Sequence, residues 1–178
     1  FQTHNPYLIE SYFRARFGSD LGVSRYYTFR KEWKNPARVL EILNEGVEKK
    51  VAWLICDYGC DKFVGSKQDP TIPFDCPRSD HEAVALFEKS AALGNSEAKL
   101  WLGHAVATIH GDREKAAECF EESTQRCNCI KGVTCHHGYA NGGHFELGEM
   151  YYHGNHNQSD EPDLPSALRW YRAGAAAQ

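Results

Sequence analysis

The chain has 178 residues, of which 42% are hydrophobic and 25% are charged, enough for one packed domain or one repeat array. Its net charge is −4 and its Lys and Arg residues do not cluster, which argues against a nucleic-acid-binding protein. No apolar run approaches the roughly 18 residues that cross a bilayer. We therefore expect a soluble protein without a membrane span, intracellular or organellar rather than secreted.

Residues 1–34 hold nine of the 22 aromatic residues of the chain. Asn5-Pro6 is typical of a helix start and Gly18 of a helix end, and a second helix is predicted from Ser24 to Trp33. This region is interpreted either as a hydrophobic helical cap or as an anchor for a protein partner, because aromatic residues are enriched in interface cores. The anchor residues would be Tyr26, Tyr27, Phe29 and Trp33.

A third helix, opened by Asn35-Pro36, begins a region in which one helical pattern recurs three times. Each copy has an Ala and an aromatic residue four positions later, which places both on one helix face. The pairs are Ala83/Phe87, Ala116/Phe120 and Ala167/Tyr171. The residues a further four positions on are Ala91, Thr124 and Ala175, and such small residues would let a neighbouring helix approach.

A second helical pattern alternates with the first and combines a small residue, three spacers and Leu-Gly. It occurs as Ala98/Leu102/Gly103 and as Gly143/Leu147/Gly148, whereas residues 50–58 have Leu54 followed by Ile55 where Gly is expected. A Gly inside a helix costs about 1 kcal/mol relative to Ala. Its recurrence predicts that another helix packs directly against Gly103 and Gly148.

These segments resemble the Sel1-like repeat, a relative of the tetratricopeptide repeat. The best matches are "LFEKSAALGNSEAKLWLG", from Leu86 to Gly103, and "ALRWYRAGAAAQ", from Ala167. The resemblance covers roughly residues 35–178, and it implies an all-α fold. Antiparallel helix pairs would stack into an α/α solenoid with a right-handed superhelical twist and long inserted loops.

Three insertions lengthen the expected repeats, at about residues 60–80, 127–143 and 153–165. The first two repeated Ala positions, Ala83 and Ala116, are 33 residues apart, but the next, Ala167, follows only after 51. Within a repeat array such insertions form loops, commonly on a binding face.

The insertion at 127–143 contains the densest group of cysteine and histidine residues. Cys127, Cys129 and Cys135 together with His136 or His137 would supply the four ligands of a structural zinc ion, with His137 as the preferred fourth ligand. A disulfide from Cys135 to Cys127 or Cys129 is a second interpretation, and free cysteines on a solvated loop are a third. The sequence leaves all three open.

No catalytic motif accompanies this pattern. The chain has no nucleophile elbow, no phosphate-binding loop and no dinucleotide fingerprint, and acidic residues such as Asp112 and Asp163 sit where helix caps are expected. We therefore expect a non-catalytic scaffold or adaptor that binds protein partners, as a component or assembly factor of a larger complex. A metal- or redox-responsive module at residues 127–137 and a non-catalytic fragment of a larger enzyme are the alternatives, and no cofactor beyond a structural zinc ion is expected.

The metal hypothesis predicts about one equivalent of zinc in the protein purified without chelators, measured by mass spectrometry. The Cys127→Ser/Cys129→Ser variant should lose it, because two of four ligands are removed. A zinc content below about a tenth of an equivalent in the wild-type protein would contradict the hypothesis.

Overall fold

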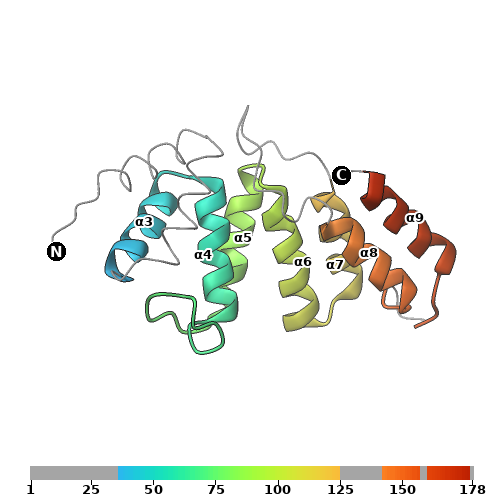
Figure 1. Ribbon diagram of the computed structural model, residues 1–178, viewed down its shortest axis with the longest axis horizontal. Coiled ribbons are helices and arrows are strands. Elements are labelled where there is room, and N and C mark those ends of the chain that lie inside the picture. Colours follow the sequence, from blue (N-terminus) through green and yellow to red (C-terminus); the bar gives the residue numbers. More distant parts are fainter. Residues whose placement is uncertain (1–35, 125–141, 157–159, 177–178) are drawn as a thin grey trace.

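The computed structural model describes residues 36–124, 142–156 and 160–176, and the regular structure within these ranges is entirely α-helical. The helices are α3 (Pro36–Glu48), α4 (Ala52–Val64), α5 (Asp80–Ala92), α6 (Ser96–His110), α7 (Arg113–Ser123), α8 (Gly142–Tyr152) and α9 (Leu164–Ala176). They follow one another along the long axis of the molecule, with α3 near one end and α9 at the other (Figure 1). The predicted all-α solenoid is confirmed.

The helices form three antiparallel pairs, α4–α5, α6–α7 and α8–α9, and each pair packs more extensively within itself than against its neighbours. We call the first helix of each pair the A helix and the second the B helix. The A helices α4 and α6 contact each other directly, whereas among the described residues no comparable contact joins the B helices α5 and α7. We therefore call the layer formed by the A helices the inner layer of the stack.

One contact recurs in all three pairs: the aromatic ring of the B helix lies directly on a glycine of the A helix. A Cβ atom placed on these glycines would come within 2.4–2.6 Å of a ring carbon, closer than real Cβ atoms approach. The contacts are Gly59 with Phe87, Gly103 with Phe120 and Gly148 with Tyr171. The predicted packing against Gly103 and Gly148 is confirmed, and it explains why glycine is tolerated in the middle of these helices.

The first repeat corrects one sequence interpretation. Ile55 was expected to occupy the glycine position of its helix, but the residue that receives the aromatic ring is Gly59, four positions later. Ile55 is instead fully buried. The Leu54-Ile55 pair therefore is not the equivalent of Leu-Gly in the other repeats. In this helix Tyr58-Gly59 occupies those two positions.

The small residues that permit close approach also lie one position away from the expected ones. The position seven residues after each repeated Ala is buried, and it holds Ser90, Ser123 and Gly174. Of the expected residues, Ala91 and Thr124 are only half-buried and Ala175 is exposed. Seven residues make almost two whole turns of 3.6 residues, so the seventh position returns to the face of the Ala, whereas the eighth turns away from it.

Ser90 also connects three helices through hydrogen bonds. Its hydroxyl donates to the carbonyl oxygen of Ala52 at 2.6 Å and accepts from the Nδ2 atom of Asn95 at 3.0 Å. The Oδ1 atom of Asn95 accepts from the backbone N–H of Glu97 at 3.1 Å and thereby caps α6. Because Ser90 and Asn95 are both buried, this network fixes the start of α4 and of α6 against the end of α5.

The insertion between α4 and α5 packs into the core instead of forming an open binding loop. Ile72, Phe74 and Cys76 are buried in a cluster with residues of α3 and α4, among them Val39 and Trp53. The Ser66 side chain closes the segment, since it donates to the carbonyl oxygen of Cys76 and accepts from its N–H. Residues 65–79 therefore fill the space beside the first repeat.

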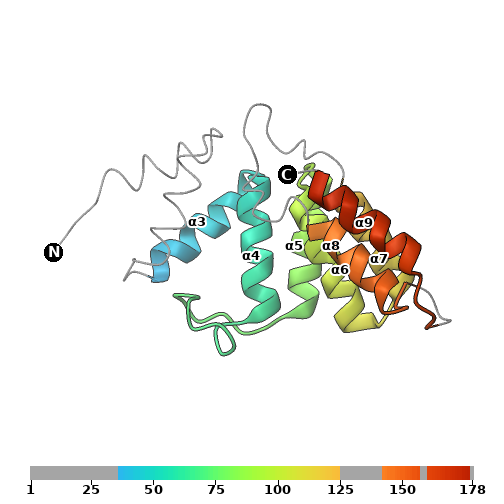
Figure 2. The same ribbon diagram turned by 45° about the vertical axis from the view of Figure 1, so that its right-hand side comes forward.

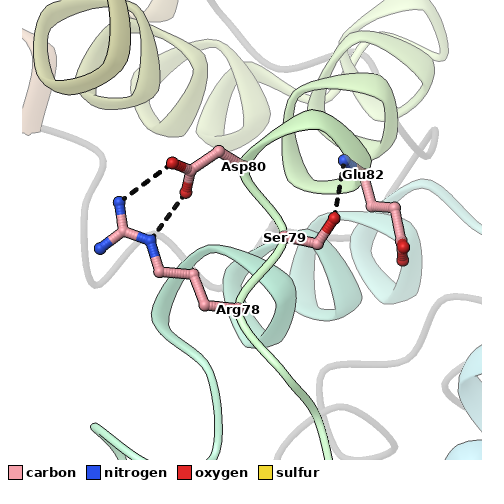
Figure 3. A network of polar contacts seen from close by, with 4 residues as sticks. All are labelled: Arg78, Ser79, Asp80 and Glu82. Atoms are coloured by element: carbon pink, nitrogen blue, oxygen red, sulfur yellow. Dashed lines mark hydrogen bonds and ion pairs between the residues drawn. The ribbon is translucent and has the colours of Figure 1, made fainter.

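The insertion ends in a polar network that begins α5 (Figure 3). Ser79 is the N-cap, and its hydroxyl oxygen accepts from the backbone N–H of Glu82 at 3.4 Å. The Arg78 guanidinium donates to both carboxylate oxygens of Asp80, at 2.8 and 3.3 Å. The Glu82 carboxylate pairs with Lys62 of α4 at 2.6 Å, so the start of α5 is also tied to its A helix.

The contact at Gly103 predicts the effect of a single added methyl group. In Gly103→Ala the new Cβ would meet the Phe120 ring at 2.5 Å, and we expect a loss of about 1–3 kcal/mol in the free energy of unfolding despite the better helix propensity of Ala. Chemical denaturation measures the change. Thr108→Ala, at an exposed position of the same helix, is the control and should change stability by less than about 0.5 kcal/mol.

Combining Gly103→Ala with Phe120→Leu should cost less than the two single changes added together, because a smaller side chain makes room for the methyl group. Strict additivity of the two changes would contradict the proposed contact.

Candidate functional site

Ionisable and aromatic side chains of the A helices meet on the inner layer of the stack. Glu97, Trp101 and His104 are spaced by four and three residues on α6, so they share one face of that helix. Asp57 of α4 approaches this face from one side and Glu146 of α8 from the other, with 3.8 Å between the Nε2 atom of His104 and the Oε1 atom of Glu146. We call these five residues the inner face.

The electrostatics of the inner face are dominated by two neighbouring carboxyl groups. Burial and, to a smaller extent, the negative charge of Asp57 raise the pKa of Glu97 to about 7, although a hydrogen bond from Trp101 acts in the opposite direction. A carboxyl group with this pKa is partly protonated at neutral pH. The inner face would therefore gain from a positive charge placed beside these two groups.

An aromatic chain holds the middle of the inner face in place. Trp101 stacks on Phe87 with ring centroids 6.3 Å apart, and Phe87 meets Phe63 edge-on at the same separation. On the other side, Trp101 contacts His104 at 5.7 Å, and His104 meets Phe120 edge-on at 5.1 Å. The chain crosses from α4 to α7, so the orientations of Trp101 and His104 are set by the same rings that pack on the glycines.

Burial lowers the pKa of His104, and the neighbouring Glu146 carboxylate partly opposes this shift. The imidazole is therefore predominantly neutral at pH 7, and its approach to Glu146 is a polar contact between α6 and α8 rather than a full ion pair. This contact brings the second and third repeats onto one continuous surface.

The thiols of Cys60 and Cys119 have an environment that disfavours nucleophilic chemistry. Burial, followed by a hydrogen bond with Cys56, raises the pKa of Cys60 well above its ordinary value, and burial also raises the pKa of Cys119. A catalytic thiol needs the opposite shift, because the thiolate is the nucleophile. Within residues 36–124, 142–156 and 160–176, no group of three or more His, Cys, Asp or Glu residues could hold a metal ion.

A Tyr–Glu–His arrangement on the last repeat is structural in character. The Tyr171 hydroxyl donates to the Oε1 atom of Glu149, whose other oxygen lies 3.4 Å from the Nε2 atom of His153. Burial and the Glu149 carboxylate raise the pKa of Tyr171 to about 12, so the phenol stays protonated and acts as a hydrogen-bond donor. The arrangement ties α9 to α8.

The sites predicted from sequence fall largely outside the described residues. The possible zinc ligands Cys127, Cys129, Cys135 and His137 lie there, and so do the possible anchor residues Tyr26, Tyr27, Phe29 and Trp33. Both hypotheses stay predictions.

Two acidic residues that were expected to be helix caps have that role. Asp112 accepts from the N–H of Lys115 at 3.0 Å, and Asp163 accepts from the N–H of Ser166 at 3.1 Å. The cap interpretation of the two carboxylates is confirmed. His144 is half-buried, with its ring 5.9 Å from that of Trp170.

Sequence reasoning missed the inner face, although a signal was present. Asp57, Trp101 and Glu146 each stand two residues before the glycine that receives the aromatic ring. With Gly59 recognised as the first of these glycines, the three residues fall into one register and must lie on the same side of their helices.

The Sel1 repeat family matches the chain over residues 73–95 and 142–178. The second match contains α8 and α9, and the first contains α5 and the end of the insertion before it. No curated protein matches the chain. Of the helices in the described ranges, none combines the length and the apolar character needed to cross a membrane.

The raised pKa of Glu97 predicts a pH dependence of stability. Between its ordinary value of 4.5 and about 7 the folded state binds more protons than the unfolded state, so stability falls as the pH rises through this window. Glu97→Gln removes the ionisable group. We expect this variant to exceed the wild-type protein in stability by about 2 kcal/mol at pH 8, and the advantage should disappear toward pH 5.

Thermal unfolding of both proteins at pH 5, 6, 7 and 8 measures the effect. Glu88→Gln, at an exposed position of α5, is the matched control and should follow the wild-type curve. Parallel curves for Glu97→Gln and the wild-type protein would contradict the assigned environment of Glu97.

Proposed function

Because this chain is a Sel1-like repeat protein, we propose that it is a non-catalytic scaffold whose inner face binds a basic segment of a protein partner and so helps to assemble or regulate a larger complex. Sel1 repeats generally mediate protein–protein interaction. The proposal adds a surface, and a class of partner, to that general role.

One observation carries the proposal: equivalent positions of three successive A helices contribute to a single surface. These positions hold Asp57, Trp101 and Glu146, and their neighbours Glu97 and His104 fill the space between them. Repeat proteins typically bind through extended surfaces composed in this way, because each repeat adds a few side chains to a rigid array. The raised pKa values of Cys60 and Cys119 argue against these two thiols as nucleophiles.

The chemistry of the inner face favours a partner with Lys or Arg. A cation beside Glu97 and Asp57 would return the Glu97 carboxyl to its ionised form and would form charge-assisted hydrogen bonds. Half-buried Trp101 offers part of its ring as a platform for an Arg guanidinium. Glu146 adds a third carboxylate, so an extended basic segment would find acidic partners along the inner layer of the stack.

Site-specific photo-crosslinking in cells that produce the protein tests this function. We expect a benzophenone side chain at position 57 or 146 to give discrete adducts with one partner, since both positions lie on the inner face. The same group at Ala85, an exposed position of the B helix α5, is the control and should give none.

Adding Glu97→Lys to the position-146 crosslinker variant should reduce the adduct at least fivefold, because it reverses the charge that attracts a basic segment. Equal adducts from position 85, or a Glu97→Lys variant that remains folded by circular dichroism and crosslinks undiminished, would contradict the proposal.

A further inference from the structure

The large hydrophobic side chains that remain exposed in the described part of the chain all lie on the last repeat. Phe145 and Tyr152 of α8 are 54% and 52% exposed, and Leu164 and Leu168 of α9 are 56% and 48% exposed. Helix α9 stands at the end of the row of helices in Figure 1, and in Figure 2 it lies in front of α8. Leu164 and Leu168 are four residues apart, so they form one stripe along α9.

The repeat register shows which kind of element fits this stripe. Leu168 follows the repeated Ala167 by one position, just as Val84 and Ala117 follow the repeated Ala residues of α5 and α7. Val84 packs against a cluster that includes Ala98 and Ala105 of α6, and Ala117 packs against a cluster that includes Leu147 of α8. On the first two B helices this position is therefore half-buried against a core cluster to which the next A helix contributes, whereas on α9 it is exposed among the described residues.

The charge on α9 indicates the chemistry of its occupant. Four residues after Leu168 stands Arg172, where α5 and α7 have Glu88 and Glu121. Helix α9 also carries Arg169 and contains no Asp or Glu, in a chain whose net charge is −4. Arg169 lies over the ring of Trp170, whereas Arg172 is exposed beside the apolar stripe. An occupant that satisfies Arg172 must present acidic residues beside its own apolar stripe.

We infer that the α9 face, defined as Leu164, Leu168, Arg172 and Ala175, is a docking site for an acidic amphipathic α-helix of a partner protein. The apolar stripe of the partner covers Leu164 and Leu168, Ala175 allows close approach, and acidic residues pair with Arg172. This inference rests on the proposed scaffold function and adds a second surface to it. A second copy of the chain fits less well, because α9 contains no Asp or Glu that could pair with Arg172 across a symmetric contact between two α9 faces.

Fluorescence anisotropy with two synthetic peptides tests the docking site. Both peptides are rhodamine-labelled helices of 20 residues with Leu and Ala on one stripe, and one carries Glu and the other Lys at the flanking positions. We expect the whole protein to bind the Glu peptide at least fivefold more tightly than the Lys peptide, with a preference that weakens as salt is raised.

Two substitutions on the α9 face test the apolar stripe and the charge separately. Leu168→Asp should reduce binding of the Glu peptide at least tenfold, and Arg172→Glu should reverse the preference between the peptides. Lys89→Glu, which makes the same change of charge at an exposed position of α5, is the matched control and should leave binding unchanged. Circular dichroism of each variant establishes that it is folded.

Three outcomes would overturn the inference. The first is equal binding of the two peptides, and the second is a Glu peptide that binds Leu168→Asp as tightly as the wild-type protein. The third is a doubled mass in sedimentation equilibrium that Leu168→Asp returns to a single chain, which would assign the α9 face to a second copy. Because crosslinking from positions 57 and 146 reports on a different surface, it would still succeed if only the α9 inference failed.

Discussion

The contact between a B-helix aromatic ring and an A-helix glycine is the constraint on which the stack depends. It occurs at Gly59, Gly103 and Gly148, and at each of them even one methyl group would collide with the ring. The absence of a side chain lets the two helices of a pair approach closely, and the ring fills the space that remains. The same rings also extend toward the inner layer, where Phe87 stacks on Trp101 and Phe120 meets His104. The contact that builds each pair thus orients the side chains available for binding.

Contacts between pairs add small residues and a few buried hydrogen bonds to the stacking of Phe87 on Trp101. Ser90 and Asn95 connect the first pair to the start of α6, and Ser123 lies where a Cβ of Gly143 would collide with its hydroxyl. Such contacts fix the spacing between neighbouring pairs. They therefore determine how far apart Asp57, Trp101 and Glu146 lie, which is the geometry that a partner would recognise.

Much of the fold could be predicted from the sequence, because the packing positions follow helical periodicity. The Ala and aromatic residues four apart identified the three B helices, and Gly103 and Gly148 identified two of the A helices. The first A helix was aligned to the repeat four residues too early, because Leu54-Ile55 was interpreted as the equivalent of Leu-Gly. The burial of Ile72, Phe74 and Cys76 could not be foreseen either, since it depends on contacts with α3 and α4 that periodicity does not encode. The inner face required the corrected register, which only the contact between Gly59 and Phe87 established.

Comparison of equivalent positions in the repeats separates the residues that hold the stack together from the residues that a partner could contact. The repeated Ala is invariant within the chain, as are the glycine and the aromatic character of its ring, because their packing leaves no room for change. Two positions before the glycine the residue changes from Asp57 to Trp101 to Glu146, and four positions after Leu168 and its equivalents it changes from Glu88 and Glu121 to Arg172. Apart from Trp101, which stacks on Phe87, these positions are exposed or half-buried and carry little of the packing, so their chemistry can vary from repeat to repeat without loss of the fold. The acidic inner face and the basic α9 face are consequences of that freedom, and opposite charges on two separate surfaces would allow one rigid stack to hold two different partners at once.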